Sequence, residues 1–165
     1  MKKLIFVRHS KAEEPSEEIS DFERSLTIKG KSISGVMALR LKEKEKSAGV
    51  IITSPAFRAL ETALIFAEEF RIEPEKIIMN SNLYYKMDYN YLSDLLSVTG
   101  NEINILTLFG HNPSFTHIAG NLCREGCDFI PKSGIAVISF KVESWADISK
   151  RSGKMDYFLK PEKVL

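Results

Sequence analysis

Short apolar runs alternate with helix-like segments along this chain, and the alternation limits the folds that it can adopt. Residues 4–7, 50–52 and 103–109 are rich in the aliphatic, β-branched and aromatic residues that favour buried strands. Between these runs, apolar residues recur at the spacing of a helix. Because strands that alternate with helices form βαβ units, the sequence predicts an α/β fold around a mostly parallel sheet.

Length and composition indicate an ordinary globular protein. The 165 residues suffice for one sizeable hydrophobic core, so we expect a single domain over residues 1–165. The net charge of +1 gives no general attraction to nucleic acid or to an anionic membrane, and we expect neither as a partner. No apolar run is long enough to span a membrane, and the run before Arg8 is too short for a signal peptide. Two cysteines, Cys123 and Cys127, are too few for a disulfide scaffold, so a cytoplasmic location is expected.

Capping signals place the first two helices. Thr27 precedes a segment with helical periodicity that includes Val36 on its apolar side. Ser54 is a good N-cap and Pro55 suits the first helical position, so a second helix is predicted to begin there. Arg58 lies in the first turn of this helix, off its apolar stripe, and can lean back over the strand edge. The predicted stripe consists of Ala56, Leu60, Ala63, Leu64 and Ala67.

The second half of the chain repeats the pattern. Residues 77–79, 135–142 and 157–159 are predicted to be further strands. A helix is predicted to open at Asn112-Pro113, directly after the strand-like run 103–109. Its predicted apolar face consists of Phe115, Ile118, Ala119 and Leu122.

Three predicted strands end at, or lead directly to, side chains that suit phosphate chemistry. Arg8 and His9 follow the first strand, Arg58 follows the second, and the run 103–109 leads to His111. Parallel strands place their carboxyl ends on one side of a sheet, where ligands bind and helix N-termini favour anions. Two guanidinium groups and two imidazoles at that edge predict a pocket for a dianionic phosphoryl group.

The chemistry of such a pocket follows from its residue types. A phosphoryl group in transfer spreads negative charge over its oxygens, so clamping and alignment dominate catalysis. Arg8, Arg58 and His111 suit the clamp, and each charge-assisted hydrogen bond contributes roughly 1.5–3 kcal/mol. Nearby positive charge lowers the pKa of His9 and keeps it neutral, so it can attack phosphorus and form a phosphohistidine that water hydrolyses. The arginines supply the charge that a metal ion supplies elsewhere, so no metal and no cofactor are expected.

Several motifs in this chain resemble those of one protein superfamily. Arg8-His9-Ser10 is similar to the Arg-His-Gly signature of the histidine phosphatase (phosphoglycerate mutase-like) superfamily, with Ser10 in place of glycine. Residues 53–62 resemble its Ser-Pro-x-x-Arg-x-x-x-Thr element. Residues 110–113 and 21–30 resemble the SixA-like phosphohistidine phosphatases within that superfamily. The resemblance covers residues 4 to about 160, in the same order along the chain.

The resemblance implies a phosphoglycerate mutase-like fold with three α/β/α layers. It also implies that His9 is the nucleophile and that phosphate is bound by Arg8, Arg58 and His111. Phosphate or sulfate is therefore expected to occupy the site.

Other residues near the motifs are candidates for binding the substrate. These are Ser10, Lys11, Arg24 and Asn112. Lys11 equally suits a solvated surface position, and Arg24 equally suits a pair with Asp21 that fixes the loop.

The chain departs from the superfamily at the proton donor. Many members carry a glutamate as general acid after the third strand, where Leu83-Tyr84-Tyr85-Lys86 stands here and Tyr85 is the nearest counterpart. An alkoxide leaving group needs that proton badly, whereas phosphohistidine leaves as neutral imidazole, whose conjugate acid has a pKa of about 6.5. The missing acid and a chain too short for a large capping insertion favour phosphohistidine on a protein as substrate. Asp21, Glu13 and Asp88 remain open as alternative acids.

Three other interpretations stand beside this one. The chain could be a small-molecule phosphomonoesterase, or a pseudo-phosphatase that binds a phosphorylated partner without turnover. It could also be a metalloprotein that uses His9, His111, His117 and Cys123. The last is weakened because His117 falls within a predicted helix and because Cys-x-x-x-Cys is not a zinc spacing. Cys123 is more simply a core thiol.

Overall fold

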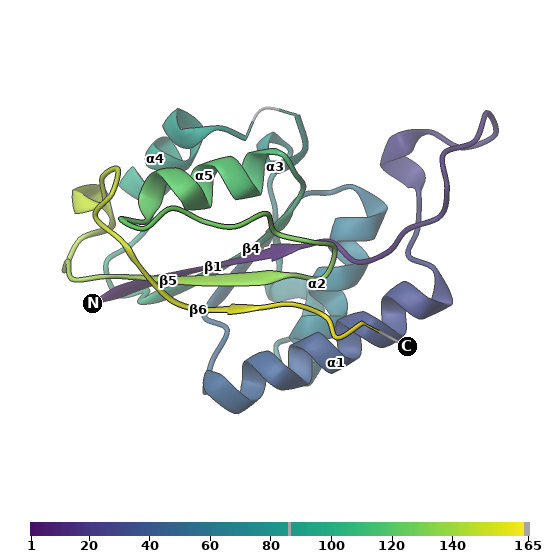
Figure 1. Cartoon of the computed structure of the whole chain (residues 1–165), viewed down its shortest axis with the longest axis horizontal. Helices are drawn as coiled ribbons and strands as arrows, with labels where there is room; N and C mark the ends of the chain where they lie inside the picture. The colour runs from purple at the N-terminus through teal and green to yellow at the C-terminus, as the bar shows by residue number, and fades with distance from the viewer. Residues whose placement is uncertain (86, 164–165) are drawn as a thin grey trace.

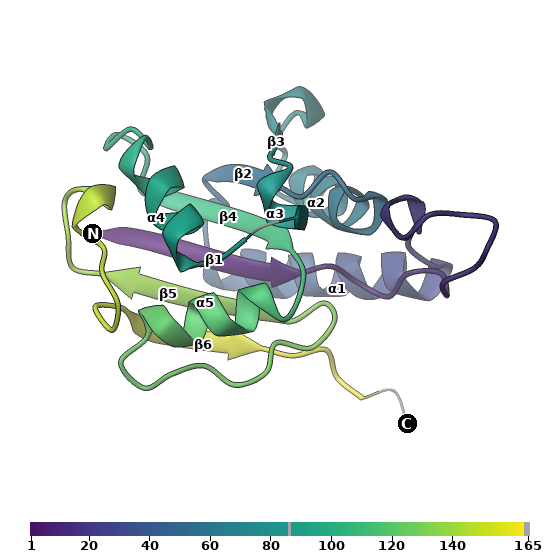
Figure 2. The same cartoon turned by 90° about the horizontal axis from the view of Figure 1, so that it is seen from above.

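A central β-sheet organises the molecule. The computed structural model describes residues 1–85 and 87–163, so Lys86, within the segment discussed above, lies outside the described residues. The strands are β1 (Lys2–Arg8), β2 (Val50–Thr53), β3 (Ile78–Met79), β4 (Ile105–Gly110), β5 (Ile135–Phe140) and β6 (Lys154–Leu159). In the described part of the chain they form one six-stranded sheet in the order β3-β2-β4-β1-β5-β6 (Figure 1; all six strands are labelled in Figure 2).

Strand direction brings three carboxyl ends to one edge of this sheet. β1 pairs in parallel with β4, and Arg8 lies opposite Gly110. β4 pairs in parallel with β2, and Thr53 lies opposite Phe109. β3 is parallel to β2, whereas β5 is antiparallel to both β1 and β6. The residues that follow β1, β2 and β4 therefore share one rim of the sheet.

Helices cover both faces of the sheet. They are α1 (Ile28–Lys44), α2 (Phe57–Glu69), α3 (Asn82–Tyr85), α4 (Tyr89–Ser97) and α5 (Ser114–Leu122), with short 3-10 helices η1 (Asp21–Glu23), η2 (Pro74–Lys76) and η3 (Trp145–Asp147). α1 and α2 lie on one face, and α3, α4 and α5 lie on the other (Figure 1 and Figure 2). The predicted three-layer α/β/α fold with a mostly parallel sheet is confirmed.

Side chains of β1 alternate between the two cores that result. Ile5 and Val7 join a buried cluster with α1 and α2, whereas Leu4 and Phe6 join a second cluster with α4 and α5. This strand is buried on both faces because each face carries a helical layer. It therefore holds its carboxyl end rigidly.

Two helices differ in detail from the predictions. α1 begins directly after Thr27 as expected, and the Thr27 hydroxyl accepts a hydrogen bond from the Gly30 N–H. Val36, predicted on the apolar side, is 54% exposed. α2 begins at Phe57 and not at Pro55, because Ser54 lies in the loop and its hydroxyl binds the Ala56 N–H and His111 instead of capping the helix.

The buried face of α2 is rotated from the predicted stripe. Leu64 is exposed, whereas Thr62 and Phe66 are buried. Arg58, predicted to lie off the stripe, is only 6% exposed, so it belongs to the buried face. The stripe prediction was wrong here because it ranked apolar residues alone and gave no place to buried polar groups that have partners.

Two further side chains belong to the core. Cys123 is buried, as expected, and Trp145 is buried with its indole N–H donating to the Ile103 carbonyl. The predicted helix after residues 103–109 is α5, and its expected apolar face is buried. None of the helices in the described part of the chain combines the length and apolar character that a membrane span needs.

Candidate active site

His9 lies just beyond the carboxyl end of β1, and its ring orientation is fixed by its neighbour. The Nδ1 atom is 2.7 Å from the carbonyl oxygen of Ser10. A carbonyl oxygen can only accept, so Nδ1 carries the proton and Nε2 keeps its lone pair. Burial is the largest cause that lowers the pKa of His9 to about 3; the hydrogen bond to Ser10 opposes it, and nearby His111, Arg58 and Arg8 add to it. His9 is therefore neutral at pH 7, with Nε2 available as a nucleophile.

The backbone around His9 is held from several elements. The His9 N–H donates to the Gly110 carbonyl of β4, and the Ser133 N–H donates to the His9 carbonyl, each at 3.1 Å. The Ser10 N–H donates to Thr62 Oγ1 of α2 at 3.1 Å, and the Thr62 hydroxyl donates to the Arg58 carbonyl at 2.7 Å. The buried Ser10 and Ser133 hydroxyls contact each other. The loop that carries His9 is thus attached to β4, α2 and the segment before β5.

His111 follows β4 and faces His9. The two imidazole centroids are 5.1 Å apart. His111 Nε2 lies 2.8 Å from Ser54 Oγ, and burial followed by nearby Arg58 lowers the pKa of His111 to about 3. Its Nδ1 atom is buried without a hydrogen-bond partner among the described residues. When the Ser54 hydroxyl donates to Nε2, the one proton of the neutral His111 ring is on Nδ1. The Nδ1 N–H is then free to bind an anion.

Two arginines approach the histidines with unused donors. Arg58 Nη1 donates to the Asp21 carbonyl at 2.7 Å, and Nη2 donates to Asp21 Oδ2 at 3.0 Å. Arg8 Nη1 donates to the Ile130 carbonyl at 3.1 Å, and the Arg8 guanidinium lies 5.4 Å from the Phe129 ring centre. The Nε atoms of both arginines are buried without a partner in the described part of the chain.

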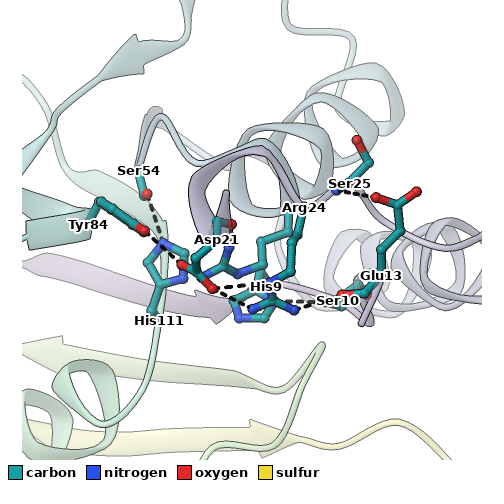
Figure 3. A network of polar contacts seen from close by, with 10 residues as sticks. His9, Ser10, Glu13, Asp21, Arg24, Ser25, Ser54, Tyr84 and His111 are labelled. Atoms are coloured by element: carbon teal, nitrogen blue, oxygen red, sulfur yellow. Dashed lines mark hydrogen bonds and ion pairs between the residues drawn. The ribbon is translucent and has the colours of Figure 1, made fainter. Parts of the chain in front are cut away.

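Asp21 of η1 connects Arg58 and Arg24 with Tyr84 (Figure 3). Its carboxylate accepts from Arg58, from Arg24 Nη2 at 2.8 Å and from the Tyr84 hydroxyl at 2.7 Å. Burial raises the pKa of the Asp21 carboxyl, but the hydrogen bonds from Tyr84, Arg24 and Arg58 outweigh it and hold the pKa well below its usual range. Asp21 is therefore a fixed negative charge that positions Arg58.

Comparison with solved structures shows that the chain has a known fold. A candidate phosphohistidine phosphatase, SixA, from Agrobacterium tumefaciens is 22% identical, with 98% of this chain and 99% of that one covered at a TM-score of 0.78. The protein histidine phosphatase SixA in complex with tungstate is also 22% identical, with 96% and 97% covered at a TM-score of 0.80. The chain has the SixA fold.

More distant structures share this fold. A mycobacterial glucosyl-3-phosphoglycerate phosphatase bound to inorganic phosphate is 11% identical, with 95% of this chain and 96% of that one covered at a TM-score of 0.66. No protein-family model and no curated protein matches the sequence. The phosphoglycerate mutase-like fold that the sequence resemblance implies is thus confirmed by structure.

Within the SixA fold, the four further candidates for substrate binding hold different positions. The Asn112 side chain is engaged on both sides: Nδ2 donates to the Ile130 carbonyl, and Oδ1 accepts from the backbone and hydroxyl of Thr116. Lys11 is exposed, and Ser10 is buried, with its hydroxyl against that of Ser133. Arg24 pairs with Asp21, the alternative that the sequence left open.

Each candidate general acid has a structural partner. Glu13 accepts from the Ser25 N–H at 3.3 Å, and Asp88 caps α4 by accepting from the Tyr91 N–H at 2.8 Å. Asp21 is held ionised. Tyr85 is 68% exposed, and it is Tyr84 that reaches the site, with its ring centre 5.4 Å from that of His111. The sequence alone does not indicate which of the two adjacent tyrosines reaches the site. The contacts of Tyr84 with Asp21 and His111 depend on the path of the chain after β3.

Of the residues of the metalloprotein hypothesis, His9 and His111 face each other, but neither His117 nor Cys123 joins them in a metal-binding group. His117 is exposed on α5, and Cys123 is buried at the end of that helix. Over residues 1–85 and 87–163, no three His, Cys, Asp or Glu side chains are grouped so that they could hold a metal ion.

Proposed function

We propose that this protein is a phosphatase that works through a phosphohistidine intermediate on His9. The observation that carries the proposal is the fixed tautomer: Nδ1 donates to Ser10, so Nε2 presents its lone pair. Burial and neighbouring charge keep the ring neutral. A neutral imidazole with a free lone pair, beside two guanidinium groups, is the nucleophile that transfer of a dianionic group requires.

Unused donors support the binding of phosphate. Arg8 Nε, Arg58 Nε and His111 Nδ1 are buried without partners in the described residues. A buried polar group that lacks a partner costs roughly 1–3 kcal/mol, which a bound anion would recover. We therefore assign Arg8, Arg58 and His111 to the phosphate clamp. The structures of SixA with tungstate and of the mycobacterial phosphatase with phosphate support the binding of such an oxyanion by a protein of this fold.

The reaction has two transfers. Nε2 of His9 forms a bond to phosphorus while the bond to the leaving group breaks, and the electron pair of that bond goes to the leaving atom. Water then attacks the phosphohistidine and releases inorganic phosphate, which returns His9 to its starting form. The arginines supply the positive charge at each step, so the proposed reaction needs no metal ion.

We propose phosphohistidine on a protein partner as the substrate. The available carboxylates support this choice, because Glu13 and Asp88 accept backbone hydrogen bonds and Asp21 is held ionised. An N–P bond tolerates the lack of an acid far better than the O–P bond of an alkyl phosphate. We also propose a cytoplasmic location and one catalytic domain over residues 1–165, in line with the free thiols of Cys123 and Cys127.

A panel of substrates tests the proposal. Phosphohistidine-bearing proteins and small phosphomonoesters are compared at pH 7, with and without EDTA. We expect turnover of the phosphohistidine proteins that survives the chelator. Faster turnover of a sugar phosphate would support the phosphomonoesterase instead, loss of activity with EDTA would support the metalloprotein, and binding without turnover would support the pseudo-phosphatase.

A further inference from the structure

Four aromatic side chains from three elements form a continuous group beside His111. This aromatic rim consists of Phe22 on η1, Phe57 on α2, and Tyr84 and Tyr85 on α3. The ring centres of Tyr84 and Phe22 are 5.3 Å apart, those of Phe22 and Phe57 are 6.1 Å apart, and those of Tyr84 and Tyr85 are 4.6 Å apart. The Tyr84 ring also meets His111 edge to face.

The rim is open to solvent although it is aromatic. Tyr85 is 68% exposed and Phe57 is 39% exposed. Phe22 and Tyr84 are half-buried, and they pack against each other and belong to neither core cluster. The proposed chemistry gives these rings no role, because His9, His111 and the arginines account for the nucleophile and the phosphate clamp.

The rim lies beside the proposed phosphate clamp. Tyr84 contacts His111 through its ring and Asp21, the partner of Arg58, through its hydroxyl (Figure 3). In a displacement at phosphorus, the leaving group lies opposite the attacking atom, so it points away from His9 and out of the clamp. Whatever is bonded to the phosphoryl group therefore lies near the rim.

We infer that the aromatic rim binds the imidazole ring of the substrate phosphohistidine, an inference that rests on the proposed function. A flat ring packs favourably against aromatic side chains, and the phosphoimidazole ring is cationic once its distal nitrogen takes a proton from solvent, which aromatic faces also favour. The P–N bond then breaks, its electron pair stays on nitrogen, and the ring leaves as neutral imidazole. The proton arrives with the substrate, so no protein acid is required.

Two small phosphoramidates separate ring recognition from phosphate binding. The leaving group of phosphoimidazole is an imidazole ring. The leaving group of phosphoramidate is ammonia, which has no ring. The ratio of their kcat/KM values in one variant cancels effects on the phosphate clamp that both substrates share. Tyr84→Phe removes the hydroxyl and keeps the ring, whereas Tyr84→Leu removes both. Val98→Ala, at an exposed residue that follows the C-terminal end of α4 and is not part of the rim, serves as the control.

We expect Tyr84→Phe and Val98→Ala to keep the wild-type ratio and Tyr84→Leu to lower it about five- to tenfold, the range of one aromatic contact. Tyr85→Ala, at an exposed position where folding is safe, is expected to lower the ratio in the same direction. Unchanged ratios in both ring-removing variants would overturn the inference, as would an equal fall in Tyr84→Phe and Tyr84→Leu. Failure of the wild-type protein to turn over either compound would overturn the proposed function itself.

Discussion

The Nδ1 atom of His9 donates to the carbonyl oxygen of Ser10 at 2.7 Å, and this contact determines which ring nitrogen faces the substrate. A histidine is versatile because either nitrogen can carry the proton. Here that choice is made by a backbone group, and the backbone group is in turn held through the Ser10 N–H by Thr62. The reactive state of His9 is thus built into the loop.

Replacement of His9 by alanine should abolish turnover. The substitution removes the only atom that we assign to attack phosphorus, while the clamp formed by Arg8, Arg58 and His111 remains. Incubation with a radiolabelled phosphohistidine substrate, followed by rapid denaturation, should trap an acid-labile label on the wild-type protein and none on His9→Ala. A labelled His9→Ala protein would show that the phosphoryl group is carried elsewhere.

Replacement of Arg58 by alanine should lower kcat/KM by about 10²–10³-fold, the cost of losing one donor to a developing anion. Arg58→Lys keeps the charge but loses the planar fork, so an intermediate loss is expected. Steady-state kinetics with inorganic phosphate as inhibitor should show weaker inhibition in both variants. Rates like those of the wild type in Arg58→Ala would remove Arg58 from the clamp.

The positions of Arg8, His9 and His111 at the carboxyl ends of the strands were predictable because they depend on local sequence signals. The apolar run before Arg8 identifies a buried strand, and the run before His111 identifies another. Parallel pairing of β1 with β4 then brings the residues after them together without further information. Prediction of these positions needed only periodicity and the geometry of a parallel sheet.

The contacts made by loops were not predictable in the same way. Tyr84 meets Asp21 although 63 positions separate them, and no local pattern specifies such a pairing. The burial of Arg58 was not predictable either, because its side-chain hydrogen-bond partner, Asp21, belongs to η1 and not to the helix of Arg58. Periodicity ranks residues by hydrophobicity, whereas these positions are decided by hydrogen bonds between distant segments.

Stability should fall as the pH is lowered from about 6.5 towards 3, because both histidines have a folded pKa of about 3. The unfolded chain binds protons below pH 6.5 that the folded protein does not, so each histidine contributes a slope of about 1.4 kcal/mol per pH unit. Urea unfolding between pH 5 and 6.5 measures this slope, and Asp21 does not titrate there because its pKa lies well below its usual range. The slope should be about halved in His111→Gln. An undiminished slope would mean that His111 is not buried in its neutral form.

Thr62 should matter for both stability and activity although we assign it no direct part in the reaction. Its buried hydroxyl accepts from the Ser10 N–H and donates to the Arg58 carbonyl. Thr62→Val preserves the shape but leaves the Ser10 N–H buried without an acceptor, which should cost about 1–3 kcal/mol in unfolding free energy. Thr62→Ser keeps the hydroxyl and is the matched control. Equal kinetics and equal urea midpoints for the two variants would contradict this role.

Ser10 and Ser133 should behave as one unit. Both hydroxyls are buried and contact each other, and the Ser133 N–H also holds the His9 carbonyl. Ser10→Ala or Ser133→Ala leaves the other hydroxyl buried without its partner, at a cost of about 1–3 kcal/mol, whereas removing both hydroxyls leaves no unpaired group. The double variant should therefore be more stable than the sum of the single losses predicts, by an interaction energy of about 0.5–3 kcal/mol. Urea unfolding of the four proteins measures this energy, and strict additivity would show that the two hydroxyls are independent. Because the Ser10 carbonyl also accepts from His9 Nδ1, we expect kcat to follow the same non-additive pattern, with little change in KM.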